Sequence, residues 1–230
     1  MTTEVLRSLD IPVLFDDHDE TSSTHTSSEA KAMTRITFAI ATVLSLAFTP
    51  LAAQDFQKGM AAVQAGDFAT AVQEWTPLAE AGDARAQLAL GAMYEFGQGV
   101  LQDYAEAVRL YRLAADQGAA NAQYNLSHMY ANGQGVPQDY AEAVRLFRLA
   151  AEQGDASAQT DLGYMYAYGK GVLQDNVTAH MWYNISAANG NELGGTNRDS
   201  IAEFMTQQAI EQAQAMAREC MSSGYQNCGY

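Results

Sequence analysis

Basic residues, cysteines and catalytic signatures are all scarce in this chain of 230 residues. Residues 54–230 carry 9 Lys and Arg against 20 Asp and Glu, so their net charge is near −11. Such a charge argues against nucleic acids and anionic membrane surfaces as partners. No H-E-x-x-H, G-x-S-x-G or C-x-x-C pattern occurs, and the histidines beyond residue 53, His128 and His180, lie 52 residues apart. We therefore expect neither a metal nor a cofactor.

Long hydrophobic runs are also lacking. One apolar run, residues 36–48, has 13 residues and is too short to span a bilayer. Together with the small residues that follow it, this run is typical of a signal peptide over 33–53 that starts at Met33. Residues 1–32 are then an upstream extension that is disordered or not translated. The sequence predicts a periplasmic or secreted protein with no membrane span in its mature form; a cytoplasmic protein with an apolar N-terminal helix and a signal anchor are the alternatives.

The only two cysteines, Cys220 and Cys228, lie close together near the C-terminus. They are separated by seven residues that include Ser222, Ser223 and Gly224, so the intervening chain can turn back on itself. In an oxidising compartment the two thiols should therefore form a disulfide that closes the loop 220–228. Two free thiols are the alternative.

The most informative feature that is present is an internal repeat. Segments that open at Asp67, Asp103 and Asp139 are spaced by 36 residues, and a degenerate fourth segment opens at Asp175. The second and third copies are identical at 25 of 36 positions. A fixed period of this length predicts a repeat architecture in which each copy is one small structural unit.

Each unit has the pattern of two helices. In the second copy, apolar residues within 107–115 recur at i, i+3, i+4, i+7 and i+8, which places them on one helical stripe. Asp103 followed by Glu106 is a capping-box signal, and Gly118 stands where a helix C-terminus needs a left-handed residue. A second stripe lies within 122–130. Each repeat is therefore expected to be a helical hairpin.

A helical hairpin cannot bury its own apolar stripe, so such units stack and share a continuous core. Between units, Gly133-Gln134-Gly135-Val136 is expected to act as a flexible turn. The predicted fold is all-α, an α/α solenoid of about four 36-residue hairpins within one domain, 54–230. Its predicted repeats are 67–102, 103–138, 139–174 and a degenerate 175–205, and its predicted capping helices are 55–65, 198–205 and 206–221.

The landmarks of the copies carry a family resemblance. The patterns A-x-x-x-[WYF]-x-x-x-A-x-x-G, A-Q-x-x-L-x-x-M-Y and G-x-G-V-x-Q-[DN] closely resemble the Sel-one-like repeat (SLR) family, a relative of the tetratricopeptide repeats, over residues 66 to about 190. This resemblance implies an α/α solenoid that serves as a binding scaffold. Some cysteine-rich members of the family are described as penicillin-binding or weakly β-lactam-hydrolysing. Those members carry a cysteine pair in each repeat, which this chain lacks.

The second helix is where the repeats differ most from one another. A solenoid contacts its partner with side chains that stacking does not need, and mixed aromatic and polar positions favour such a contact. Ordinary drift on a solvated face is the alternative interpretation. The candidate surface consists of Phe96, Tyr124, Asn125, His128, Asn132, Asp161, Tyr164 and Tyr168.

The leading hypothesis is a non-enzymatic, monomeric, exported scaffold that binds a protein or peptide segment of the cell envelope. The competing class is a weak β-lactam-binding or hydrolysing enzyme like the cysteine-rich relatives. In that case His128 and Asp161 would be the acid/base pair, although no nucleophile accompanies them in the sequence. Self-association through an incompletely capped end is a third possibility.

Overall fold

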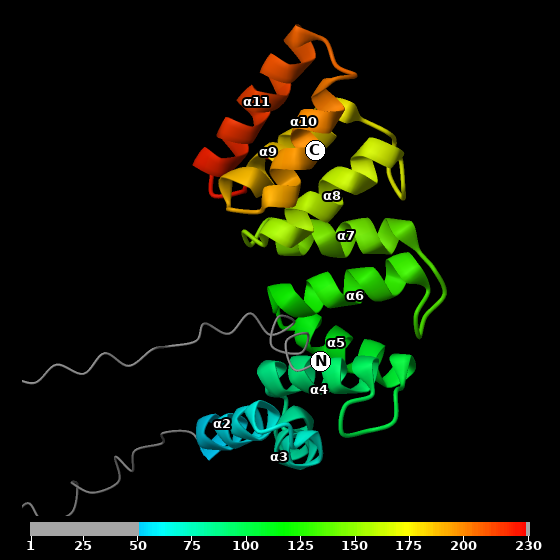
Figure 1. The fold of residues 1–230 in the computed structure, drawn as a ribbon, viewed down its shortest axis with the longest axis vertical. Helices are drawn as coiled ribbons and strands as arrows, with labels where there is room; N and C mark the ends of the chain where they lie inside the picture. Colours follow the sequence, from blue (N-terminus) through cyan, green and yellow to red (C-terminus); the bar gives the residue numbers. More distant parts are fainter. Residues whose placement is uncertain (1–50, 229–230) are drawn as a thin grey trace, which may run out of the picture.

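A computed structural model describes residues 51–228, and within them the chain forms ten α-helices and no strand (Figure 1). The helices follow one another in chain order from one end of the molecule to the other, which confirms the all-α solenoid. The helices are α2 (Leu51–Gln64), α3 (Phe68–Glu80), α4 (Ala84–Phe96), α5 (Tyr104–Asp116), α6 (Ala120–Asn132), α7 (Tyr140–Ala151), α8 (Ala156–Tyr168), α9 (Asn176–Ala188), α10 (Glu192–Ala202) and α11 (Gln207–Ser222).

The predicted signal peptide lies almost entirely outside the described residues. Only its last three residues, 51–53, fall within them, and they belong to α2. Across residues 51–228, no helix has both the length and the apolar character needed to cross a membrane.

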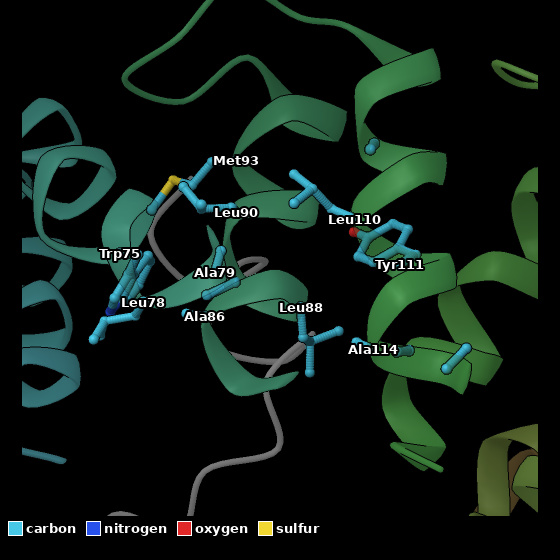
Figure 2. Packing of buried hydrophobic residues seen from close by; sticks show 14 of the residues in the cluster. Trp75, Leu78, Ala79, Ala86, Leu88, Leu90, Met93, Leu110, Tyr111 and Ala114 are labelled. Atoms are coloured by element: carbon cyan, nitrogen blue, oxygen red, sulfur yellow. The ribbon is translucent and has the colours of Figure 1, made fainter. Parts of the chain in front are cut away.

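Helices pack most closely across the boundaries between repeats. Contacts are more extensive between the second helix of one unit and the first helix of the next, α4 with α5, α6 with α7 and α8 with α9, than between the two helices of one unit. Neighbouring units therefore share their buried surface, as a solenoid requires. Figure 2 shows this for the first boundary, where Leu88 of α4 lies toward Ala114 of α5.

Small residues allow the helices to approach, and large aromatic residues fill the space that remains. Tyr111 and Tyr183 occupy equivalent positions two units apart, and both are buried. Each ring packs against a glycine of the preceding helix, Gly91 or Gly163, where an added Cβ would lie 2.5 or 2.7 Å from the ring. Close packing at this density leaves no room for a larger side chain. The recurring aromatic position and the recurring small position are thus one structural feature.

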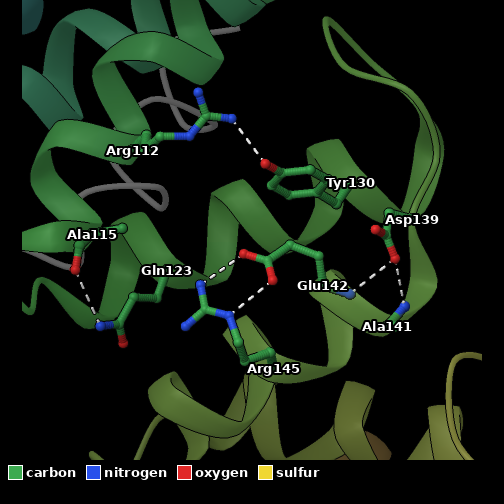
Figure 3. A network of polar contacts seen from close by, with 8 residues as sticks. All are labelled: Arg112, Ala115, Gln123, Tyr130, Asp139, Ala141, Glu142 and Arg145. Atoms are coloured by element: carbon green, nitrogen blue, oxygen red, sulfur yellow. Dashed lines mark hydrogen bonds and ion pairs between the residues drawn. The ribbon is translucent and has the colours of Figure 1, made fainter.

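The Asp residues that open the units cap their helices, but the capping box forms only in part. The carboxylate of Asp139 accepts hydrogen bonds from the backbone N–H groups of Ala141 and Glu142 (Figure 3). The backbone N–H of Asp139 donates to the carbonyl of Tyr130 at the end of the preceding helix, so Glu142 is not needed there. Glu142 pairs instead with Arg145, at 2.7 Å. The reciprocal half of the predicted box is therefore replaced by a bond between successive helices.

A buried glutamine joins the two helices in each of the first three units. Gln123 is 5% exposed, and its amide donates to the carbonyl of Ala115 at the end of the preceding helix (Figure 3). Its amide oxygen accepts a hydrogen bond from Gln153, 30 residues further on. Gln87 and Gln159 make the equivalent pair of contacts in their own units. The A-Q step of the repeat pattern therefore supplies a buried polar link to two neighbouring helix ends.

The glycine turns between units are tightly packed, which corrects the expectation of a flexible connection. Gly135 has a φ of 72°, a left-handed value that favours glycine. A Cβ added at Gly135 would also overlap the backbone carbonyl of Tyr104, the first residue of α5. The second glycine of G-x-G is thus required by both its conformation and its close contact with a helix.

Both ends of the solenoid are covered by extra helices. At the front, α2 extends over 51–64 rather than the expected 55–65, and Phe56 stacks on Trp75 with ring centroids 5.4 Å apart. At the back, α10 begins at Glu192 instead of near residue 198, because the side chain of Asn191 caps it by accepting a bond from the N–H of Gly194. This helix is the second helix of the degenerate fourth unit.

The last helix, α11, packs on α9 and carries the disulfide. Cys220 and Cys228 are bonded to each other and are both buried, at 0% and 4% exposed. The predicted pairing is therefore confirmed, and it fits an exported protein. Tyr225, within the closed loop, hydrogen-bonds to Asn189 at the end of α9, so the loop is fastened to the fourth unit.

Candidate functional site

The structure places the predicted surface residues on the second helices of three successive units. Phe96 lies on α4; Tyr124, Asn125, His128 and Asn132 lie on α6; Asp161, Tyr164 and Tyr168 lie on α8. The imidazole Nε2 of His128 is 3.1 Å from the carboxylate Oδ2 of Asp161, which links α6 to α8. The two residues singled out in the sequence as an acid/base pair are thus in direct contact.

Some of the variable positions belong to the core. Leu88 and Thr160, which correspond to Tyr124 in the neighbouring units, are only 7% and 4% exposed. Tyr124 itself packs edge-on against His128 and Phe147, with ring centroids 4.7 and 5.9 Å away. Burial, and then the nearby carboxylate of Asp161, raise the pKa of the Tyr124 hydroxyl. Tyr124 therefore packs against His128 and holds it in position, and contributes less to a surface for a partner.

A pocket of about 220 Å³ opens beside His128 and is called here the His128 pocket. The ammonium group of Lys170 donates to the hydroxyl of Tyr164 at 3.0 Å and lies 5.5 Å from the ring centre of Tyr140. None of the residues that line this pocket is a serine, threonine or cysteine. Its lining includes His128, Tyr140, Phe147, Asp161, Tyr164 and Lys170.

A second and larger pocket, of about 400 Å³, lies between α8, α9 and α10 and is called here the Phe204 pocket. Tyr168 at its edge contacts Tyr164 at the edge of the His128 pocket, with ring centroids 4.6 Å apart. The two pockets therefore lie next to each other along the solenoid. The lining of the Phe204 pocket includes Tyr168, Asn176, Tyr183, Asn197, Ile201 and Phe204.

The two pockets are the same site in successive units. A shift of 36 residues converts most of the lining of the first pocket into that of the second. The acidic residue Asp161 corresponds to the neutral Asn197. The tyrosines at 140 and 164 correspond to smaller polar residues. The full correspondence is Ala131 with Ala167, Asn132 with Tyr168, Tyr140 with Asn176, Phe147 with Tyr183, Asp161 with Asn197, Tyr164 with Ser200, and Met165 with Ile201.

One unit earlier, the position of Ala131 is occupied by Glu95. Burial raises the pKa of this carboxyl group, although the hydroxyl of Tyr111, which donates to its Oε2 at 2.6 Å, and the nearby His128 both act in the opposite direction. His128 therefore lies in the field of two carboxylates, Glu95 and Asp161. Within residues 51–228, no group of three or more His, Cys, Asp or Glu side chains is placed to hold a metal ion.

Sequence reasoning missed the residues that form the Phe204 pocket, apart from Tyr168. Asn176 and Asn197 lie in the degenerate fourth unit, whose second helix lacks the repeat pattern. Phe204 follows that helix and is 80% exposed. Adding 36 to the numbers of Tyr140 and Asp161 would have pointed to both asparagines, so the signal was present in the repeat period.

Comparison with known proteins agrees with the solenoid fold. The family model of the Sel1 repeat matches residues 84–118, 120–155 and 156–191. The chain contains three Sel1 repeats. Each Sel1 match covers the second helix of one predicted unit and the first helix of the next, which are the helix pairs with the most extensive contacts.

Two crystal structures show the same fold. One is a Sel1 repeat protein from Oxalobacter formigenes, with a TM-score of 0.60 and 26% identity, and the match covers 74% of each chain. The other is a protective antigen of uropathogenic Escherichia coli strains with an SLR fold, with a TM-score of 0.54 and 25% identity. That match covers 76% of this chain and 47% of the antigen. No curated protein sequence is significantly similar to the chain.

Proposed function

We propose that this Sel1 repeat protein is an exported scaffold that binds a protein or peptide segment in the cell envelope and does not catalyse a reaction. The observation that carries this proposal is the row of aromatic and polar side chains that crosses the second helices of successive units, from Phe96 through His128 to Tyr168. Exposed tyrosines next to pockets, with charged neighbours that fix orientation, are typical of contact surfaces.

Export is supported by two independent features of the chain. The disulfide between Cys220 and Cys228 persists in oxidising compartments. The apolar run 36–48 has the length of a signal sequence. N-terminal sequencing of the protein recovered from periplasm or culture medium tests this part of the proposal, with a new terminus near residue 54 expected. A mature chain that begins well before that position would contradict it.

The binding surface is tested by single alanine substitutions at His128, Tyr164 and Tyr168. Proteins captured from an envelope extract by the unmodified chain are identified, and the affinity of each for purified variants is then measured. We expect losses of about tenfold for at least two of the three variants, since contact residues at interfaces contribute about 1–2 kcal/mol each. Leu101→Ala is the control, because Leu101 is 91% exposed on a turn outside this surface. An equal loss of affinity in all four variants would refute the surface, and so would an unchanged affinity in every variant.

The enzyme alternative is favoured by one observation, the contact between His128 and Asp161 at 3.1 Å. A positioned imidazole and carboxylate are the usual elements of general acid–base catalysis. Hydrolysis of the chromogenic cephalosporin nitrocefin by the purified chain is the direct assay. Turnover that disappears in His128→Ala and persists in Leu101→Ala would replace the scaffold proposal with an enzymatic one.

A further inference from the structure

The Phe204 pocket differs in charge from the preceding site on the same face. The His128 pocket is lined by an imidazole, a carboxylate and an ammonium group, whereas no Asp, Glu, Lys, Arg or His lines the Phe204 pocket. In the 36-residue correspondence, Asp161 is replaced by Asn197 and Tyr164 by Ser200. A charged ligand group entering the Phe204 pocket would lose hydration without gaining an opposite charge. The pocket therefore fits an uncharged ligand.

The same pocket has a wide apolar interior. Tyr140 is replaced by the smaller Asn176, and the volume rises from about 220 to about 400 Å³. Phe204 and Tyr168 stand at its edge, 80% and 66% exposed, while Tyr183 lies buried at its base. Large exposed aromatic side chains around a hollow of this size are typical of ligand sites. The hollow is suited to one aromatic or aliphatic side chain held against these rings.

Three carboxamides border this interior, and that of Gln174 already donates to the carbonyl of Ala167. Asn176 is the first residue of α9 and Asn197 lies in α10, and among residues 51–228 neither side chain is hydrogen-bonded to another protein group. A carboxamide offers one acceptor and two donors, so it can pair with both the N–H and the C=O of a peptide group. A helical ligand has already satisfied these backbone groups internally, whereas an extended one has not.

We propose that the Phe204 pocket binds an extended, uncharged polypeptide segment. One apolar side chain of the segment enters the hollow between Tyr168 and Phe204, and Asn176 and Asn197 hydrogen-bond to the peptide groups beside it. The inference rests on the proposed function and deepens it by naming the ligand class and an anchoring site outside the His128 pocket. A saccharide would find the same amides, but the aliphatic wall formed by Ile201 and Ala167 favours a hydrocarbon side chain.

The test begins with a phage library of random twelve-residue peptides selected on the purified full-length chain. The selected peptides are synthesised, and their affinities are measured by fluorescence anisotropy for the unmodified chain and for Phe204→Ala, Asn197→Asp and Leu193→Ala. Asn197→Asp keeps the size of the side chain, removes its donor and introduces the charge found at Asp161 in the preceding unit. Leu193 is the matched control, since it is 57% exposed on the same helix but does not line the pocket.

We expect the selected peptides to share an aromatic or aliphatic residue within an uncharged stretch. Phe204→Ala should weaken their binding by about tenfold or more, because burying such a side chain contributes roughly 1.5–3 kcal/mol. Asn197→Asp should weaken it by a similar factor, and Leu193→Ala should leave it within twofold. Circular dichroism and the melting temperature of each variant separate a loss of binding from a loss of folding.

Three results would overturn the inference, and they differ in what they say about the proposed function. Peptides whose binding depends on His128 and Tyr164 but not on Phe204 or Asn197 would refute the inference alone. A chain that selects no peptide and also captures no envelope protein would refute the scaffold proposal as well. Binding of members of a glycan array that is lost in Phe204→Ala, in the absence of peptide binding, would show that the ligand class is wrong.

Discussion

Replacing Gln159 by methionine should destabilise the solenoid by about 2 kcal/mol, although the two side chains are similar in size. Gln159 is fully buried at the start of α8. Its amide nitrogen donates to the carbonyl of Ala151 at 3.0 Å, and its amide oxygen accepts a bond from the side chain of Asn189 at 2.8 Å. The substitution therefore removes two contacts that tie α8 to the ends of α7 and α9.

The magnitude follows from the surroundings of each partner. Methionine fills nearly the same volume, so the contribution of a cavity is small. The carbonyl of Ala151 keeps a second hydrogen bond, from the N–H of Gly154 at 3.0 Å, and Asn189 is exposed and can turn to water. The loss is thus the net value of two hydrogen bonds, each about 0.5–1.5 kcal/mol, rather than the larger cost of a stranded buried group.

Urea unfolding followed by circular dichroism at 222 nm measures this loss as a shift in midpoint at constant slope. The control is Gln212→Met, because Gln212 is exposed on α11 and its replacement should change the free energy of unfolding by less than about 0.5 kcal/mol. A double-mutant cycle with Asn189→Ala should show coupling of about 0.5 kcal/mol or more. A loss for Gln159→Met that equals the control would show that the buried amide does not link the repeats.

Three further predictions concern the turns, the fourth unit and the C-terminal loop. Gly135→Ala should lower the free energy of unfolding in urea by at least about 1 kcal/mol more than Gly118→Ala. Both glycines have a positive φ, but only an added Cβ at Gly135 would lie against backbone atoms. Equal losses of stability in the two variants would contradict the packed turn. His180 is 2% exposed, and burial lowers the pKa of its imidazole. As the pH falls below about 6.5, the unfolded chain therefore binds a proton that the folded chain does not. The free energy of unfolding should decrease from pH 7 to pH 5, and it should decrease less in His180→Leu; parallel pH profiles for the two proteins would refute this. Replacing Cys220 and Cys228 together by serine should lower the stability measured in thermal melts by about 2–3 kcal/mol, since the disulfide closes a loop with a sequence separation of 8. An unchanged melting temperature would show that the loop does not hold α11 in place.

The fold could be predicted because its determinants are local and repeated. Asp139 caps a helix through its own next two residues, and Gly118 ends one through its own backbone conformation, so both signals are visible within a few residues. The 36-residue period then places the second helix of each unit against the first helix of the following unit. The helix predicted from residue 198 begins earlier, at Glu192, and its sequence lacks the A-Q-x-x-L pattern of the other second helices. Its cap, Asn191, nevertheless lies 36 residues after Asp155, the cap of α8.

The candidate site was predictable only in part. The variation between copies identified His128 and Asp161, and the structure brings them into contact. The same variation also marked Thr160, which is buried and bonds to Ser186 of the next unit. Variation between repeats therefore does not distinguish an exposed position from a buried one whose neighbour has changed as well.

The sequence by itself determined the helices, their order and the stacking of the units, because caps, stripes and period are properties of neighbouring residues. It also determined the disulfide, since only two cysteines are present and they lie close together. Only the tertiary structure decided which side chains line a pocket, because α8, α9 and α10 contribute Tyr168, Asn176 and Asn197 from three different helices. A pocket depends on the space that packed helices leave between them, and that space is set by side chains far apart in the chain.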